Sequence, residues 1–479
     1  MKTTSKHIQH RRSLHFVACV LALTSALSAA LLSGCSGGTP STGVTPMVKS
    51  MSVPVLLRDA PSSQLLSFEL TIGSISLTNT AGKTVSVLGN PARIEATHLN
   101  GVSEPLLTLA LPEDTYTTAV IGYSNPEVAY LDATNTAIEY SNTNSGSVTV
   151  NLAPSITVSS TALSLSVELL LAQSVTITGS TVGINPAFNM TSLAVAAQPT
   201  NEDNGKIDGV KGAISALNAS ANSITVQTSD GASFVVSVNS STQYDGISGL
   251  PALGVGMLVE MDLATQSDGS QLATRIHVED AATHDELEGP VIKVAYTVVG
   301  SLQTAGSFKM VLRQELGADL TTANLGTVYT ISVNSQTDYN VSNRFGEDRS
   351  FPFNAVFNSS TIFAGQNVTV VVPTVSGTMA SATRVTLQQQ TVSGTVTAIA
   401  SSGGYSVYTV TLASTDFLTS LTGATTVNVY TNSNTMMVAS TPIAVGSPAR
   451  FQGLLFNNGG MLSMVSGQVN NGEHQSEGH

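Results

Sequence analysis

Tryptophan is absent from this chain of 479 residues, only 10% of the residues are charged, and cysteine occurs twice. Aromatic residues make up 5%, which leaves few rings to stack on sugars or bases. The sequence also has no Gly-x-Ser-x-Gly elbow, no phosphate-cradling loop and no Cys/His cluster with zinc spacing. We therefore expect a protein that is not an enzyme and that uses no cofactor and no metal.

Serine, threonine, valine and glycine dominate what is present. Small and β-branched residues at this density favour pleated strands and tight turns over helices. The length exceeds what one hydrophobic core supports, and it suggests three or four domains. The sequence therefore predicts an all-β, multi-domain protein.

The first 34 residues have the order of a secretory signal peptide. A start with four basic residues and no acid is followed by an apolar run over residues 16–32 and by Leu-Ser-Gly before Cys35. An uncleaved membrane anchor is the alternative. The run of about 17 residues is at the lower limit for crossing a bilayer, and uncharged residues follow it. We therefore favour cleavage, with residues 1–34 as the signal peptide.

Leu32-Ser33-Gly34-Cys35 resembles a bacterial lipobox, in which the cysteine sulfur receives diacylglycerol before cleavage. The resemblance implies that Cys35 carries the lipid that attaches the protein to a membrane. Cys19 leaves with the leader, so no internal disulfide can form. Ser36 in place of an acidic residue favours the outer membrane under the sorting rule of Gram-negative lipoproteins. Residues 35–50, rich in Gly, Ser, Thr and Pro, are expected to form a flexible tether.

The mature chain is expected to be strongly acidic. Loss of residues 1–34 removes four basic residues, so 14 Lys and Arg would stand against 31 Asp and Glu, a net charge of −17. Such a surface repels phosphate backbones, which makes nucleic acid an improbable partner.

Residues 51–198 predict a first β-sandwich domain, because six short alternating segments are separated by turn signals. The segments are residues 53–57, 68–77, 85–88, 117–121, 147–152 and 163–167. Asp59-Ala-Pro61 and the later Leu111-Pro-Glu-Asp-Thr-Tyr116 resemble an N-terminal domain of unknown function (family 4382-like) of uncharacterised bacterial lipoproteins. The second motif is also similar to an edge turn of transthyretin-like sandwiches.

The rest of the chain predicts a repeat. Residues 237–244 and 332–339 agree at six of eight positions, Ser-Val-Asn-Ser-x-Thr-x-Tyr. A hydrophobic residue, a variable residue and glycine open three units at residues 210–212, 287–289 and 392–394. Glycine here suits a bend or bulge where a small barrel turns a corner, and the strand number fits an OB-like barrel. The arrangement resembles tandem OB-like domains of unknown function (family 5666-like) in exported bacterial proteins.

These patterns predict a fold class that is all-β, with an N-terminal β-sandwich (Ig- or transthyretin-like) followed by three tandem OB-like β-barrels. The sandwich is followed by a linker, repeat 1, a second linker, repeats 2 and 3, and a disordered tail. The expected bounds of these parts are 199–208, 209–280, 281–285, 286–389, 390–469 and 470–479.

Three further segments could carry a site. Residues 277–288 hold His277, His284 and five acids, but we interpret them as a solvated linker rather than a metal site. Residues 201–208 resemble a calcium loop but lack the carboxylates at both ends, so a linker is favoured. The insertion at 344–353 is aromatic and basic and could form a binding loop, or its phenylalanines could cap the second barrel. Its candidate binding residues are Arg344, Phe345, Arg349, Phe351 and Phe353.

The sequence thus predicts an exported lipoprotein, anchored to the cell envelope through Cys35 and acting as a structural or binding module. An envelope or surface protein, or a polysaccharide, is the expected partner. The alternative function is surface adhesion or polysaccharide contact through the loop at 344–353.

Overall fold

The computed structural model describes residues 49–201, 204–229, 231–280, 284–299, 302–317, 324–342, 351–438 and 442–470. The chain divides into two compact units, Met1–Met47 and Val48–His479, and all described residues belong to the second. Cys35 and the leader therefore lie outside the described residues. Almost every element is a strand, which confirms the all-β prediction. No helix in the described ranges is both long enough and apolar enough to span a membrane.

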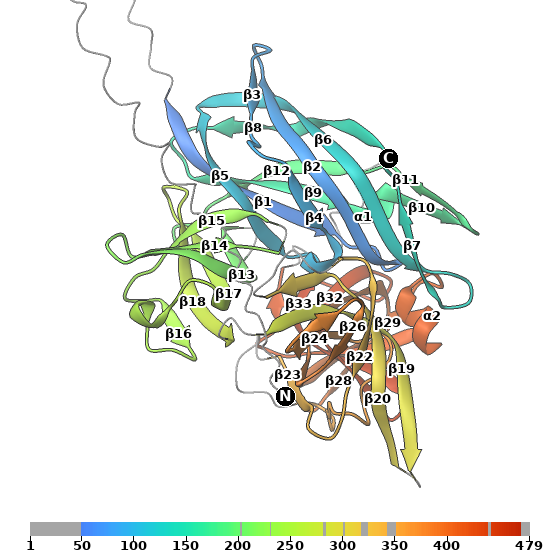
Figure 1. Ribbon diagram of the computed structural model, residues 1–479. Coiled ribbons are helices and arrows are strands. Elements are labelled where there is room, and N and C mark those ends of the chain that lie inside the picture. The colour runs from blue at the N-terminus through green and yellow to red at the C-terminus, as the bar shows by residue number, and fades with distance from the viewer. Residues whose placement is uncertain are drawn as a thin grey trace, which may run out of the picture. The chain divides into compact units, whose positions relative to one another are not determined.

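The first part of the described chain contains twelve strands and two short helices (Figure 1). Their bounds are β1 (Ser50–Ala60), β2 (Leu65–Asn79), β3 (Thr84–Ser86), β4 (Ala92–Glu95), η1 (Thr97–Leu99), β5 (Ser103–Pro112), β6 (Asp114–Leu131), β7 (Ala137–Ser141), β8 (Ser145–Val158), β9 (Leu163–Leu170), α1 (Leu171–Ser174), β10 (Val175–Thr178), β11 (Thr181–Ile184) and β12 (Phe188–Ala194).

Two sheets in this part share one hydrophobic core. The first has the order β12-β9-β1-β5, and the second has the order β3-β2-β6-β7, with β4 and β8 also paired to it. Val53 of β1, Phe68 of β2, Ile121 of β6 and Leu165 of β9 all belong to the same buried cluster. We call this part, residues 50–194, the N-terminal sheets.

Strands β1 and β2 are buried on both faces over part of their length. Residues 53–60 of β1 and 65–70 of β2 are buried without interruption. Because side chains alternate between the two faces of a strand, an unbroken buried run means that both faces are covered. Leu56 accordingly belongs to the core around β13–β18, and Leu66 packs with Ile292 and Val311.

The remaining strands form three further sheets, at residues 206–280, 285–387 and 390–470, which we call units 1, 2 and 3. Unit 1 contains β13 (Lys206–Asn218), β14 (Ser223–Gln227), β15 (Ser233–Ser237), β16 (Gln243–Asp245), η3 (Leu250–Ala252), β17 (Leu258–Thr265) and β18 (Gln271–Asp280). Unit 2 contains β19 (Asp285–Val299), β20 (Leu302–Val311), β21 (Gln314–Leu316), β22 (Val328–Ser332), β23 (Asp338–Val341), β24 (Asn367–Val372), β25 (Val375–Ser376), β26 (Met379–Ser381) and β27 (Arg384–Leu387). Unit 3 contains β28 (Gln390–Ser402), β29 (Tyr405–Thr411), α2 (Phe417–Thr422), β30 (Thr426–Thr431), β31 (Met436–Met437), β32 (Pro448–Asn458) and β33 (Met461–Asn470).

Units 1 and 3 have the same strand order. The pairings run β13-β14-β15-β18-β17 and back to β13 in unit 1, and β28-β29-β30-β33-β32 and back to β28 in unit 3. The pairs β15–β18 and β30–β33 are parallel, whereas the other pairs in each ring are antiparallel. Unit 2 follows the same plan, with its last strand divided into β26, which pairs with β22, and β27, which pairs with β24.

The glycine that opens each unit is explained by a close approach of two strands. A Cβ at Gly212, Gly289 or Gly394 would overlap the carbonyl oxygen of the residue that ends the second strand of its own unit. The sequence had suggested a bend or bulge at the glycine itself, but the bulge lies elsewhere. The strand register shifts three residues later in each unit, at Ser215, Ile292 and Thr397.

A four-residue turn after the third strand also recurs in all three units. In unit 1 the Thr242 hydroxyl accepts a bond from the Asn239 amide and donates one to the Ala273 carbonyl on β18, at 3.0 and 2.8 Å. The same two bonds join Asn334, Thr337 and Ala382 in unit 2, and Asn432, Thr435 and Ser466 in unit 3. The turn therefore ties the third strand to the fifth, and the Asn-Ser-x-Thr sequence is its signature.

Candidate functional site

Lys211 and Glu288 occupy the residue before the opening glycine in units 1 and 2, and they form an ion pair. The distance from Lys211 Nζ to Glu288 Oε2 is 2.7 Å, and the two side chains are 9% and 15% exposed. Glu288 also accepts bonds from Asn367 and Thr369 of unit 2, each at 3.0 Å. Burial alone would raise the pKa of Glu288, but the Lys211 charge and these bonds hold the pKa below its usual value. A buried, fully bonded carboxylate thus connects two units.

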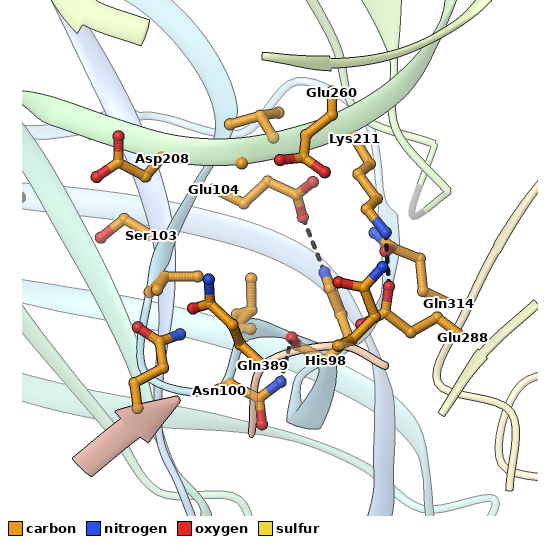
Figure 2. A pocket seen from close by; sticks show the side chains of 16 residues that line it. His98, Asn100, Ser103, Glu104, Asp208, Lys211, Glu260, Glu288, Gln314 and Gln389 are labelled. Atoms are coloured by element: carbon orange, nitrogen blue, oxygen red, sulfur yellow. Dashed lines mark hydrogen bonds and ion pairs between the residues drawn. The ribbon is translucent and has the colours of Figure 1, made fainter. Parts of the chain in front are cut away.

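Next to this pair lies a polar cavity of about 50 Å³. Figure 2 shows its lining, which comes from the N-terminal sheets and from units 1 and 2, and Gln452 of unit 3 also borders it. Three further carboxylates line it, and each has a cationic neighbour. Glu104 lies 3.1 Å from His98, Asp208 lies 2.8 Å from Lys206, and Glu260 lies 4.0 Å from Arg275.

Two side chains in the cavity wall have unmet hydrogen-bonding capacity. Gln389 is 6% exposed and Ser103 is 2% exposed. Among the described residues, neither the Gln389 Nε2 and Oε1 atoms nor the Ser103 Oγ atom has a hydrogen-bond partner. Buried polar groups are almost always bonded, so atoms like these need an explanation.

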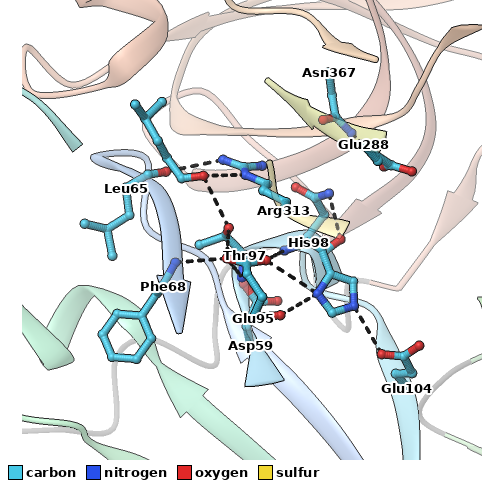
Figure 3. Close-up of polar contacts among 12 residues, drawn as sticks. Asp59, Leu65, Phe68, Glu95, Thr97, His98, Glu104, Glu288, Arg313 and Asn367 are labelled. Carbon is cyan, nitrogen blue, oxygen red and sulfur yellow. Dashed lines mark hydrogen bonds and ion pairs between the residues drawn. The ribbon is translucent and has the colours of Figure 1, made fainter. Parts of the chain in front are cut away.

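A tight turn of the N-terminal sheets borders the same cavity and is organised by Glu95 (Figure 3). The Glu95 carboxylate, fully buried at the end of β4, accepts bonds from the amides of Phe68, Thr97 and His98 at 2.9, 3.2 and 2.8 Å. Burial raises the pKa of Glu95, but the bond and charge of His98, the Arg313 charge and the Thr97 bond together hold the pKa below its usual value. Glu95 therefore acts as a buried anion that holds this turn.

Both ring nitrogens of His98 face acceptors. Nε2 lies 3.1 Å from Glu104 Oε2, and Nδ1 contacts the backbone carbonyl of Glu95 and lies 3.5 Å from its carboxylate. A backbone carbonyl can only accept, so Nδ1 must carry a proton, and a carboxylate at Nε2 favours a second one. His98 is therefore held as a bridge between two carboxylates.

Two arginines bring units 2 and 3 against this turn. Arg313 of unit 2 is 5% exposed and donates to the backbone carbonyls of Leu66 and Leu65 at the start of β2, at 2.6 and 3.3 Å (Figure 3). Its guanidinium also lies 6.0 Å from the centre of the Phe417 ring of α2. Arg450 of unit 3 lies against Gly101. Burial lowers the pKa of both arginines, and Asp59 is among the acids that oppose this effect.

Asp59 is fully buried near the end of β1. Its Oδ1 accepts a bond from the Gly101 amide at 2.6 Å. Burial raises the pKa of Asp59 to about 7, against the lowering effects of that bond and of Arg450 and His98. We call Asp59, Glu95, His98, Arg313 and Arg450, together with the ion pair of Lys211 and Glu288, the charged junction.

The residues singled out in the sequence are only partly described. Cys35, Arg344, Phe345 and Arg349 lie outside the described residues. Phe351 and Phe353 are half-buried, and their rings contact Phe456 of unit 3 with centroids 5.4 and 5.8 Å apart. The end of the insertion therefore packs where units 2 and 3 meet.

Apart from residues 281–283, which lie outside the described residues, the acidic segment 277–288 is not the solvated linker that the sequence suggested. His277 belongs to β18, while Glu286 and Glu288 belong to β19. Glu286 is 3% exposed, and Glu288 is bonded to Lys211. Burial is possible because partners from other strands replace water. Within the described ranges no three His, Cys, Asp or Glu side chains lie close enough to hold a metal ion.

In the segment 201–208, of which residues 202 and 203 lie outside the described residues, the turn around Asn204 leads into a strand. Asn204 Oδ1 accepts bonds from the Thr200 and Asn201 amides at 2.7 and 3.0 Å, and β13 already begins at Lys206. The strand starts before the expected linker end because Lys206 and Ile207 pair with β17.

Comparison with known families bears on unit 1. Residues 211–277 match the domain of unknown function DUF5666. The match begins at Lys211 and ends within β18, so it covers most of unit 1 and supports the family 5666-like part of the resemblance. No curated protein matches the chain. The DUF5666 segment thus contributes Lys211 to the ion pair and Glu260 to the cavity wall.

Proposed function

We propose that the mature chain is a lipid-anchored protein of the cell envelope, which works as a rigid structural or binding module and catalyses no reaction. In this proposal diacylglycerol on Cys35 attaches the protein to the membrane, on the outer membrane of a Gram-negative cell. Residues 35–50 separate the anchor from the folded body.

The charged junction is the observation that carries the structural part of this proposal. Arg313 donates to backbone carbonyls of another part of the chain, Lys211 neutralises Glu288, and His98 bridges two carboxylates. Groups whose hydrogen bonds are already made within the fold hold its parts together. A catalytic acid or base, by contrast, must reach a substrate proton.

At the level of the fold, we propose that units 1–3 are OB-like barrels of the DUF5666 type and that the N-terminal sheets form a family 4382-like sandwich. The ring of five paired strands, with one parallel pair, supports the first assignment. Two sheets around one core support the second.

Surface adhesion or polysaccharide contact through residues 344–353 is the second candidate function. It is favoured by the packing of Phe353 against Tyr430 and Phe456, at 5.3 and 5.8 Å, which fixes one end of the insertion. A loop with a fixed base loses less entropy when it binds.

Metabolic labelling tests the anchor. Cells that express the full chain would be grown with an alkyne-tagged fatty acid, and the purified protein examined for label. We expect label in the wild type and in a Cys19→Ser variant but none in Cys35→Ser. A wild-type protein without label, or label that survives in Cys35→Ser, would contradict the proposal.

A further inference from the structure

Gln389 and Ser103 are buried in the wall of the polar cavity, and their side-chain polar atoms have no hydrogen-bond partner among the described residues. Gln389 offers a donor group and an acceptor, and Ser103 offers a hydroxyl that can do either. Leaving such groups unbonded costs about 1–3 kcal/mol each. Occupation of the cavity by a hydrogen-bonding molecule would remove this cost.

The charged groups around the cavity limit which molecules can bind in it, by their net charge. Glu104, Asp208, Glu260 and Glu288 line it with a single lysine, Lys211, which disfavours anions. Each of these carboxylates already has a basic neighbour, so we do not expect them to bind a further cation strongly. The unmet capacity belongs to an amide and a hydroxyl, which suit a neutral molecule that both donates and accepts.

The volume sets the size. One water needs about 10–15 Å³ of this kind of space, so a cavity of about 50 Å³ holds about three to five water-sized groups. Two adjacent CHOH groups, with four non-hydrogen atoms, have this size, and the end of glycerol or of a longer sugar alcohol presents such a pair. Carboxylates and amides in the wall are also good acceptors for neighbouring hydroxyl groups.

We propose that this cavity binds the adjacent hydroxyl groups of a small neutral polyol, with Gln389 and Ser103 as direct contacts. The site is built from the N-terminal sheets and units 1–3, so binding would also join these parts. The proposal does not rest on the lipid anchor and can be tested on soluble protein that lacks residues 1–35.

Titration calorimetry of this protein with glycerol and with erythritol is the direct test, and inorganic phosphate and methylammonium serve as charged probes. We expect saturable binding of a polyol and none of the charged probes. Gln389→Met and Ser103→Ala should each weaken binding at least tenfold. Each change removes a buried polar group that has no hydrogen-bond partner within the protein, so urea unfolding should show that neither variant is less stable than the wild type.

Ser164→Ala is the matched control, because the Ser164 hydroxyl is equally buried and equally without a partner but does not line the cavity. It should bind polyol as the wild type does. The proposal is overturned if neither polyol binds saturably and a crystal structure shows only water in the cavity. It is also overturned if methylammonium binds in place of the polyols, or if all three variants weaken binding equally.

Discussion

Lys211 and Glu288 lie at the same position of two units built on one strand plan, and their side chains form a buried ion pair of 2.7 Å. Two copies of one residue at this position could not pair in this way, because like charges repel. The opposite charges therefore specify that unit 1 meets unit 2. The third unit has the uncharged Ser393 at this position, so its own residue there does not require a charged partner.

Lys211→Met should lower the free energy of unfolding by about 3–5 kcal/mol, because it leaves Glu288 buried without its cation. The double variant Lys211→Met/Glu288→Gln should lose less than the single variant, since no uncompensated charge remains. Urea titration measures both. Lys206→Met is the control. Its partner Asp208 is similarly close, at 2.8 Å, but Lys206 is 29% exposed, and we expect a loss of about 0–1 kcal/mol. Equal losses in the single variants at 206 and 211 would contradict the role of burial.

Gly289→Ala should be among the most damaging single changes in unit 2. Its Cβ would overlap the carbonyl oxygen of Val311, and backbone cannot move aside as a flexible side chain can. We expect a loss of several kcal/mol or failure to fold, measured by circular dichroism and thermal unfolding. Gly306→Ala on the neighbouring β20 should be tolerated, because the nearest atom to its Cβ is Thr297 Oγ1 at 3.5 Å. Tolerance of both changes would mean that the close strand approach is wrong.

Asp416 should make stability fall as the pH rises. It caps α2 by accepting a bond from the Leu418 amide at 2.7 Å, and burial raises its pKa to about 7 from the ordinary 3.8. A carboxyl with a raised folded-state pKa stabilises fully below its unfolded pKa, and this contribution is lost as the pH rises through about 7. Asp416→Asn keeps the cap and removes the titration.

Between pH 5 and pH 8, Asp416→Asn should therefore gain about 1–3 kcal/mol relative to the wild type in urea unfolding. Asp132→Asn is the control, because hydrogen bonds from Thr136 and Thr134 lower the pKa of the partly exposed Asp132. Its contribution is lost only below its ordinary pKa, so no such gain is expected in this range. A difference between Asp416→Asn and the wild type that is the same at both pH values would refute the assignment.

Cys35→Ser should release the protein from membranes. Without a thiol to carry lipid, the precursor should stay uncleaved or appear in soluble fractions, as membrane flotation and mass spectrometry would show. Membrane-bound Cys35→Ser protein of the mature size would disprove lipid attachment at this residue.

Within the insertion at 344–353, we expect the arginines to contribute to binding and Phe353 to contribute to stability. Arg344→Ala with Arg349→Ala is expected to weaken retention of the protein on isolated envelope material and to leave unfolding unchanged. Phe353→Ala should instead cost about 1–3 kcal/mol of stability, because its ring contacts Tyr430 and Phe456. If the arginine variant is retained as well as the wild type, adhesion through this loop is excluded.

The repeat in units 1–3 could be predicted from the sequence, because the Asn-Ser-x-Thr turn and the opening glycine recur in each unit with the same strand order. The charged junction could not be found in this way. Glu288 finds its cation 77 residues earlier in the chain, and Arg313 bonds to a strand 247 residues away. A dense acidic stretch is typical of exposed linkers, so Glu286 and Glu288 misled the interpretation. The clue that was present is Arg313 itself, a charge that directly follows the apolar residues Met310-Val-Leu312.

Arg313 forms hydrogen bonds to the backbone carbonyl oxygens of Leu65 and Leu66. Every amino acid carries that oxygen, so substitutions at positions 65 and 66 leave this bond intact as long as the strand keeps its course. Loss of the guanidinium removes it at once. Substitution of Arg313 therefore abolishes the contact, whereas substitutions at positions 65 and 66 do not. Among homologous chains, we expect residue identity to be retained at position 313 and to vary at positions 65 and 66 within the limits that apolar packing sets.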